Sequence, residues 1–96
     1  MANWRHTLEK VLSGTADANL RFQDLTKLLE RLGFDSRIDG SHHVYWRDDL
    51  ESIVNLQSKK GKAKPYQVRQ VRNLILDHAL DLELEDDNEE SDESFI

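Results

Sequence analysis

Residues 22–34 are Phe22-Gln23-Asp24-Leu25-Thr26-Lys27-Leu28-Leu29-Glu30-Arg31-Leu32-Gly33-Phe34, and this stretch decides the fold. Its apolar side chains recur every three or four residues, as they do on one face of an amphipathic helix. Gly33 stands where helices commonly end in a left-handed residue, and Phe34 can then fold back onto the last turn. The stretch therefore predicts a helix that buries one face against a core and ends at Gly33.

Two more helices are expected outside this stretch. The helical spacing of Trp4, Leu8, Val11 and Leu12 predicts a short N-terminal helix that ends at Ser13-Gly14. The small polar residues at 14–19 predict a loop after it. Pro65 suits the first turn of a last helix, because its missing N–H has no partner there. The apolar stripe of that last helix consists of Val68, Val71, Ile75, Ala79 and Leu82.

Three short strands are expected between the second helix and the last one, at residues 36–39, 42–47 and 52–57. Arg47-Asp48-Asp49-Leu50 predicts a hairpin turn between the last two. Short connections favour antiparallel neighbours, so the strands should form a three-stranded meander. The whole order predicts an α+β domain whose helices cover one face of the sheet and leave the other face free.

Composition narrows the class of protein. A chain of 96 residues makes one domain, and the absence of cysteine excludes disulfides and thiolate metal sites and fits a reducing cytosol. No segment approaches the roughly 20 apolar residues of a membrane span, and the start lacks the apolar run of a signal peptide. The expected parts are an N-terminal helix and loop at 1–18, a main domain at 19–82 and a disordered acidic tail at 83–96.

The net charge of −6 conceals an uneven distribution, since residues 1–80 carry +3 and residues 81–96 carry −9. Between Ser52 and Leu76 there is no acidic residue but six cations, which are Lys59, Lys60, Lys62, Lys64, Arg69 and Arg72. A local patch of this kind attracts phosphate whatever the total charge. Arg69 and Arg72 should share one helix face and extend the basic surface.

Gly40-Ser41-His42-His43-Val44-Tyr45-Trp46 carries the candidate chemistry. Imidazole titrates near neutral pH and can act as a general base and then as an acid. RNA supplies its own nucleophile, the 2′-hydroxyl, so one imidazole and nearby cations suffice for its cleavage. Because side chains alternate along a strand, His42 and His43 should point to opposite faces. The alternative is that both are ordinary strand histidines, one half-buried and one solvated.

Metal binding is disfavoured, because adjacent residues on a strand chelate poorly and the other histidines, His6 and His78, are distant in sequence. No cofactor is expected. The loop from Lys59 to Lys64 is the phosphate candidate, with Gly61 keeping it pliable and the helix start at Pro65 favouring anions. The alternative is a solvated surface loop. Stacking on bases is possible for Tyr66, Tyr45 and Trp46, although Tyr45 or Trp46 should be needed in the core.

Three segments together resemble the HicA toxins of bacterial type II toxin–antitoxin systems: residues 22–34, the Gly-Ser-His motif at 40–45, and Lys64-Pro65. Asn55-Leu56-Gln57 and residues 62–72 resemble one branch of that family. The similarity covers about residues 20–80. It implies a double-stranded-RNA-binding-domain-like fold, in which one sheet is backed by two helices. It also implies an mRNA endoribonuclease that needs no metal and is silenced by a HicB antitoxin.

The resemblance assigns the catalytic histidine to His42, with His43 as a second candidate. Many members have a histidine near the end of the third strand, where this chain has Gln57, so the leaving group would take its proton from a lysine, water or His43. The RNA-binding residues expected around His42 are Gly40, Ser41, His43, Lys59, Lys60, Lys62, Lys64 and Tyr66. Two other functions stay open: a non-catalytic RNA-binding module, and an interaction protein whose basic face docks an acidic partner or the chain's own tail.

Overall fold

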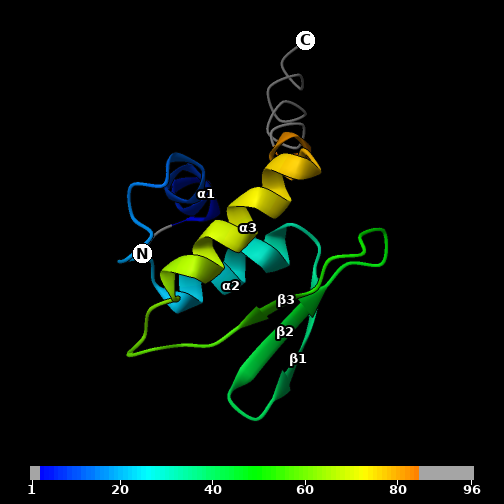
Figure 1. Cartoon of the computed structure of the whole chain (residues 1–96). Helices are drawn as coiled ribbons and strands as arrows, with labels where there is room; N and C mark the ends of the chain where they lie inside the picture. The colour runs from blue at the N-terminus through cyan, green and yellow to red at the C-terminus, as the bar shows by residue number, and fades with distance from the viewer. Residues whose placement is uncertain (1–2, 85–96) are drawn as a thin grey trace.

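The computed structural model describes residues 3–84. Its elements follow in the order α1 (Trp4–Ser13), α2 (Phe22–Arg31), β1 (Asp35–Asp39), β2 (His42–Trp46), β3 (Val54–Leu56) and α3 (Pro65–Asp77) (Figure 1). A further helical turn at residues 80–84 ends the described chain. The expected order of helices and strands is confirmed. None of the described helices has the length and apolar character that crossing a membrane requires.

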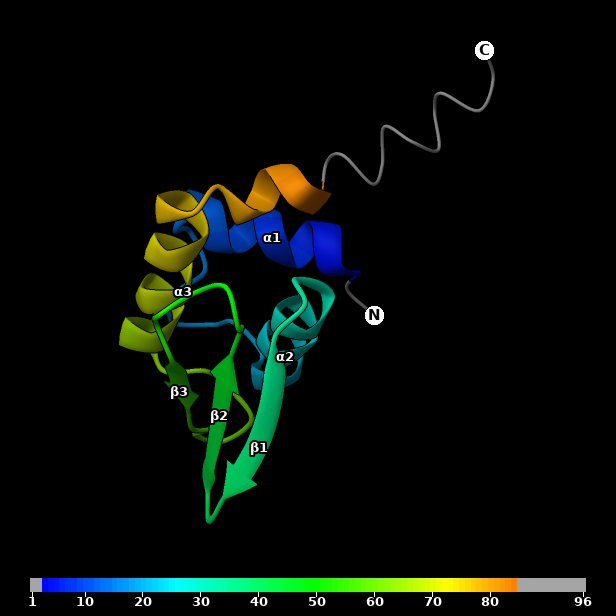
Figure 2. The ribbon, with the colours of Figure 1, turned by 90° about the vertical axis from the view of Figure 1, so that its right-hand side faces the viewer.

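The three strands form one antiparallel sheet in the order β1-β2-β3, which confirms the predicted meander. The sheet lies to one side of the helices, as the two perpendicular views show (Figures 1 and 2). Tyr45, Val54 and Leu56 are buried, while their neighbours along the strands are more exposed. Since side chains alternate along a strand, the opposite face of the sheet carries His42, Val44, Trp46 and Asn55. We call it the open face.

Helix α2 ends as its sequence predicts. Gly33 has φ +90°, the Gly33 N–H donates to the Glu30 carbonyl at 3.0 Å, and the Phe34 N–H donates to the Leu29 carbonyl at 3.1 Å. These two bonds make a Schellman motif, which satisfies carbonyls that the end of a helix would otherwise leave unpaired. Phe34 is buried, so the chain enters β1 directly over the last turn of α2.

One hydrophobic core joins the helices and the sheet. Leu8 and Val11 of α1 are buried in it together with α2 and α3, so the N-terminal helix is packed into the domain. The other buried apolar residues are Leu20, Phe22, Leu25, Leu28, Leu29, Leu32, Phe34, Tyr45, Val54, Leu56, Ala63, Val68, Val71, Leu74, Ile75, Leu80 and Leu84.

The last helix ends earlier than its apolar stripe predicted. α3 stops at Asp77, and Ala79 takes a left-handed φ of +52°, which redirects the chain into the turn at residues 80–84. Leu82, which was expected in the stripe, is 52 % exposed, whereas Leu80 and Leu84 are buried. The burial of these two leucines accounts for the break, because a straight helix would have presented a different face to the core.

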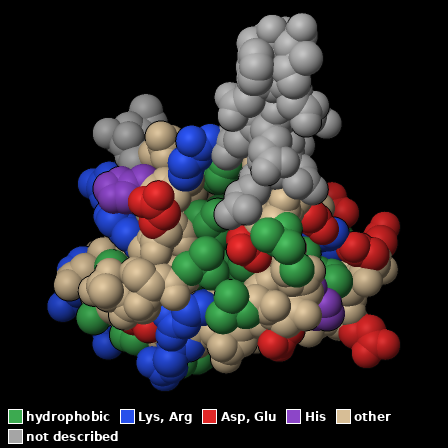
Figure 3. All heavy atoms as spheres, turned by 90° about the horizontal axis from the view of Figure 1, so that it is seen from above, with side chains coloured by type: hydrophobic (Ala, Val, Ile, Leu, Met, Phe, Trp, Pro, Cys, Tyr) green, Lys and Arg blue, Asp and Glu red, His purple; other side chains and the backbone are tan. Residues whose placement is uncertain are grey.

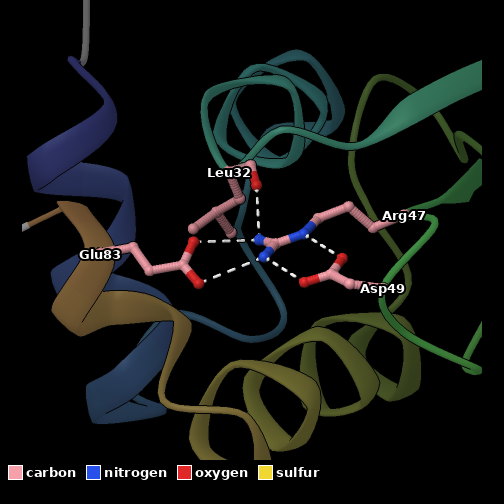
Figure 4. Close-up of polar contacts among 4 residues, drawn as sticks. All are labelled: Leu32, Arg47, Asp49 and Glu83. Carbon is pink, nitrogen blue, oxygen red and sulfur yellow. Dashed lines mark hydrogen bonds and ion pairs between the residues drawn. The ribbon is translucent and has the colours of Figure 1, made fainter.

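The acidic tail was expected to begin at Glu83, and this boundary is wrong. Glu83 and Leu84 lie in the final helical turn. Glu83 accepts two bonds from Arg47, at 3.1 and 3.2 Å, and the same guanidinium binds Asp49 and the Leu32 carbonyl (Figure 4). The rest of the expected tail, residues 85–96, lies outside the described residues.

Arg47 thus joins three parts of the chain at the end of the molecule away from the β1–β2 hairpin. The turn from Arg47 to Leu50 that was predicted between β2 and β3 is present, with the Leu50 N–H donating to the Arg47 carbonyl at 2.9 Å. Seen from above, this end of the molecule carries acidic side chains mainly on one side, with hydrophobic side chains reaching the surface in the middle (Figure 3).

Candidate functional site

The Gly-Ser pair before His42 forms the two-residue loop between β1 and β2. Asp39 pairs with His42 across the two strands, so Gly40 and Ser41 are the only residues that connect them. Gly40 has φ +65°, and Ser41 is not among the residues with positive φ. A positive φ at the first central position is typical of type II′ hairpin turns, which favour glycine there. This loop fixes His42 as the first residue of β2.

His42 is exposed on the open face and has one side-chain partner. Its Nδ1 lies 3.0 Å from Oδ1 of Asn55 on β3. Asp39 lies opposite His42 on β1, so its side chain shares the same face. The imidazole therefore stands between a carboxylate-bearing strand and an amide, with its surface open to solvent.

His43 points the other way, as the alternation along the strand predicted. Its ring packs edge-on against Phe22 of α2, with ring centroids 4.9 Å apart and planes at 73°. The side chain is half-buried between the sheet and the helices. The two histidines therefore occupy different environments, and only His42 lies on the open face.

A chain of hydrogen bonds links the Gly-Ser-His segment to the lysine-rich one. Lys64 Nζ donates to Gln57 Oε1 at 3.0 Å, and Gln57 Nε2 donates to Ser41 Oγ at 3.0 Å. Gln57 follows β3, and Lys64 is the N-cap residue of α3. An ammonium group is thus held next to the loop that carries His42.

The lysine segment is a tight turn. Lys59 and Lys62 exchange two backbone hydrogen bonds of 2.9 and 3.0 Å around Lys60 and Gly61, whose φ angles are +54° and +81°. Two positive φ angles are the signature of a type I′ turn. We call residues 59–62 the lysine turn. Gly61 was expected to keep this loop pliable, and in the structure its positive φ closes the turn.

The lysine turn is also attached to the segment that precedes α2. The Phe22 N–H donates to the Gly61 carbonyl at 3.0 Å, and the Ala63 N–H donates to the Leu20 carbonyl at 2.9 Å. Phe22 is the residue on which the His43 ring packs, so the turn is attached close to His43, on the helix side of the sheet. An open hollow of about 510 Å³ beside the turn is lined by Ala18, Lys59, Lys60, Lys62, Ala63, Lys64, Pro65 and Tyr66.

The residues of α3 that were expected to contribute to RNA binding differ in exposure. Tyr66 is 54 % exposed at the start of α3, and Arg69 is exposed one turn later. Arg72, in contrast, does not extend the basic surface, because its guanidinium binds the Asp17 carboxylate at 3.0 and 3.2 Å and the Val11 carbonyl at 3.0 Å. Its charge is neutralised within the fold, where it fastens the loop after α1 to α3.

The aromatic residues of β2 also differ from each other. Tyr45 is buried, as expected of one member of the pair, and burial raises the pKa of its hydroxyl above the usual value of 10.0. Trp46 is half-buried on the open face, two positions beyond Val44. In the part of the chain that the structure describes, no three His, Asp or Glu side chains are grouped so as to hold a metal ion.

Two residues of the site were not identified as such from the sequence. Gln67 is buried, and its side chain bridges α3 and β3: it accepts from the Lys64 and Gln57 N–H groups at 3.3 and 3.4 Å and donates to the Asn55 carbonyl at 3.4 Å. Asn55 is the partner of His42. The position of Asn55 could have been predicted, because Asn55 and Gln57 alternate with the apolar Val54 and Leu56 and should therefore face away from the core.

The comparison with known proteins gives one match. Residues 22–79, more than half of the 96-residue chain, match the family model of the HicA toxin of bacterial toxin–antitoxin systems. The matched segment begins with α2 and ends just beyond α3, so it contains the whole sheet and both segments of the site. No curated protein and no solved structure matches the chain significantly.

Proposed function

This chain belongs to the HicA toxin family of bacterial toxin–antitoxin systems, and we propose that it acts as an endoribonuclease that cleaves mRNA. The observation that carries the proposal is the exposed imidazole of His42, one residue from a serine that a glutamine connects to the Lys64 ammonium. A proton acceptor and a phosphate-binding cation are the two groups that RNA cleavage by its own 2′-hydroxyl requires.

The chemistry follows from these two groups. His42 takes the proton of a ribose 2′-hydroxyl, and the resulting 2′-oxygen attacks the adjacent phosphorus. The bond from phosphorus to the 5′-oxygen breaks, and that oxygen takes a proton from a lysine ammonium or from water, since His43 faces the helices on the other side of the strand. The products are a 2′,3′-cyclic phosphate and a 5′-hydroxyl. The RNA supplies the nucleophile, so this route needs neither a metal nor a covalent enzyme intermediate.

Phosphate binding falls to the cations and the backbone around His42. Lys64 is linked to the Ser41 side chain through Gln57, while Lys59, Lys60 and Lys62 offer further positive charge at the lysine turn. Gly40 has nothing within 4 Å of the position that a Cβ would take, so the backbone can approach the ligand there. Tyr66 is exposed beside the turn and suits stacking on a base.

The partner expected for this toxin is an antitoxin of the HicB type. Such a protein would silence the toxin by covering the open face with His42, and toxin and mRNA would meet in the cytoplasm. In this arrangement the antitoxin competes with RNA for the same surface, and the complex is inactive until the antitoxin is removed.

Replacement of the histidine tests the proposal. His42→Ala is expected to lower RNA cleavage by about 10²–10⁴-fold, the contribution of a general base, and to relieve growth arrest. His6→Ala is the matched control, because His6 is exposed on α1, outside the site. Circular dichroism checks that both variants fold. Full toxicity of His42→Ala would refute the assigned role.

A non-catalytic RNA-binding module is the second candidate, because Gln57 stands where many members have a histidine. That function predicts RNA binding that weakens with salt and survives His42→Ala, with no cleavage products from the wild-type protein. Gel analysis of RNA incubated with the wild-type protein therefore distinguishes the two.

A further inference from the structure

The contact between His42 and Asn55 determines which nitrogen of the imidazole carries the proton. Asn55 Oδ1 is a carbonyl oxygen and can only accept a hydrogen bond, so the bond of 3.0 Å requires a proton on His42 Nδ1. In the neutral ring the other nitrogen, Nε2, then has the lone pair. A neutral imidazole acts as a base only through its unprotonated nitrogen, so this tautomer leaves Nε2 as the one that can take a proton.

Asn55 is itself held in place from inside the fold. The backbone carbonyl of Asn55 accepts a bond of 3.4 Å from the Gln67 side chain, and the Gln57 backbone N–H donates to the same side chain at 3.4 Å. Gln67 is 2 % exposed, so its amide lies in the core beneath β3. The backbone of β3 is therefore fastened to α3 at the residues whose side chains touch His42 and Ser41.

Strand β1 contributes charged side chains to the open face beside His42. On β1, Asp39 lies opposite His42 and Arg37 lies opposite Val44, and both side chains share the open face with the imidazole. Asn55 on β3 and Gln57, which follows β3, are neutral. Asn55 can therefore fix the tautomer as an uncharged hydrogen-bond partner.

We infer that Asn55 is a positioning residue that holds His42 in the Nδ1–H tautomer and so directs Nε2 to the 2′-hydroxyl of RNA. The inference rests on the proposed function for the identity of the substrate. The tautomer itself is a property of the folded protein without RNA. Asn55 acts through His42 and touches no reacting atom.

Three variants of the full chain separate this role from a structural one. Asn55→Ala removes the acceptor, and Asn55→Asp keeps an acceptor but adds a negative charge. Asn73→Ala is the matched control, since Asn73 is exposed on α3, outside the site. The tautomer is read by ¹⁵N NMR of the His42 ring in the RNA-free protein, with His42→Ala identifying the signals. Cleavage of a single RNA substrate is measured from about pH 5 to 9.

Wild-type protein, Asn55→Asp and Asn73→Ala are expected to show the Nδ1–H form of His42, and Asn55→Ala is expected to lose it. Asn55→Ala should lower the cleavage rate at least about tenfold at every pH, within the 10²–10⁴-fold that a general base supplies. Asn55→Asp should recover most of the rate, but only at higher pH, because the added carboxylate favours the protonated ring.

The Nε2–H form in the wild-type protein, or a tautomer unchanged in Asn55→Ala, would overturn the inference. Equal loss of rate in Asn55→Ala and Asn55→Asp at all pH values would also overturn it, since a structural role would not distinguish the two. A failure of the proposed function has a different signature: His42→Ala would keep full cleavage, or the wild-type protein would yield no products, while the NMR result still decides what Asn55 does.

Discussion

Two glycines with positive φ angles determine the backbone on both sides of the candidate site. Gly40 opens the loop before His42, and Gly61 closes the lysine turn. Neither has a heavy atom within 4 Å of the position that a Cβ would occupy. A side chain therefore has room at both places, and its cost comes from the backbone conformation alone.

Gly61 gives the prediction that belongs to the scale of single residues. Gly61→Ala is expected to lower the free energy of unfolding by about 1–2 kcal/mol, because a left-handed residue with a Cβ is strained. Gly61→Asn should cost less, since asparagine tolerates this conformation better. Urea denaturation measures both. Equal midpoints for wild type and Gly61→Ala would show that the turn is not needed in its observed form.

The elements are fastened together by polar side chains that reach across the fold. Arg47, at the end of β2, binds the turn after β2, the end of α2 and the last helical turn through Asp49, Leu32 and Glu83. The Arg47 guanidinium holds the pKa of Asp49 below its usual value of 3.8. A carboxyl whose pKa is lowered by folding adds stability above its unfolded pKa and loses it as the pH falls through the folded one.

Asp49→Asn tests this connection. At pH 7 the variant is expected to be less stable than the wild type in urea. The difference should shrink as the pH falls below 3.8 and through the lower pKa of folded Asp49, because Asp49 then becomes protonated in the folded state as well. Asp48→Asn, at the exposed neighbouring position, is the control and should show no such change. A difference that persists at pH 2 would contradict the role given to the charge of Asp49.

Local sequence patterns predicted the helices and strands. The features that these patterns did not predict depend on contacts between residues distant in sequence. The end of α2 depends on Gly33 and Phe34 alone, so the sequence sufficed to predict it. The break at Ala79 depends on the burial of Leu80 and Leu84 against the rest of the core, which no short window contains.

The same distinction holds for the candidate site. His42 and the lysines were recognisable by type and spacing. The roles of Arg72 and Gln67 required the positions of Asp17, Asn55 and Gln57 in space. Tertiary packing places Arg72 in a partly buried ion pair and the Gln67 amide between β3 and α3, and neither role can be predicted from the residue type alone.

The molecule as a whole combines a mildly basic body with an acidic C-terminus. Residues 85–96 carry seven acidic residues and no basic ones, so removing them changes the formal charge from −6 to +1. The point of truncation matters, because Glu83 binds Arg47 and Leu84 is buried. A chain that ends at residue 84 keeps both contacts, whereas one that ends at residue 82 loses them.

The truncation after residue 84 is expected to bind RNA more tightly than the full chain at low salt and equally at high salt, since removing negative charge strengthens a screened attraction. Truncation after residue 82 should also lower the urea midpoint. Fluorescence anisotropy with a labelled RNA, using His42→Ala backgrounds to prevent cleavage, measures the affinities. Unchanged affinity at low salt would show that the acidic residues exert no electrostatic effect on RNA.

The two tryptophans lie in different parts of the fold, one on the N-terminal helix and one on the open face of the sheet. Trp4 is on α1, with the guanidinium of Arg31 from α2 5.0 Å from the centre of its ring, whereas Trp46 shares the sheet face of His42. Intrinsic fluorescence therefore contains two separable signals. With Trp4→Phe, the remaining emission reports occupancy of the open face; with Trp46→Phe, it reports detachment of the N-terminal helix. The chain carries its own pair of optical reporters, and ligand capture can be followed without attaching a dye.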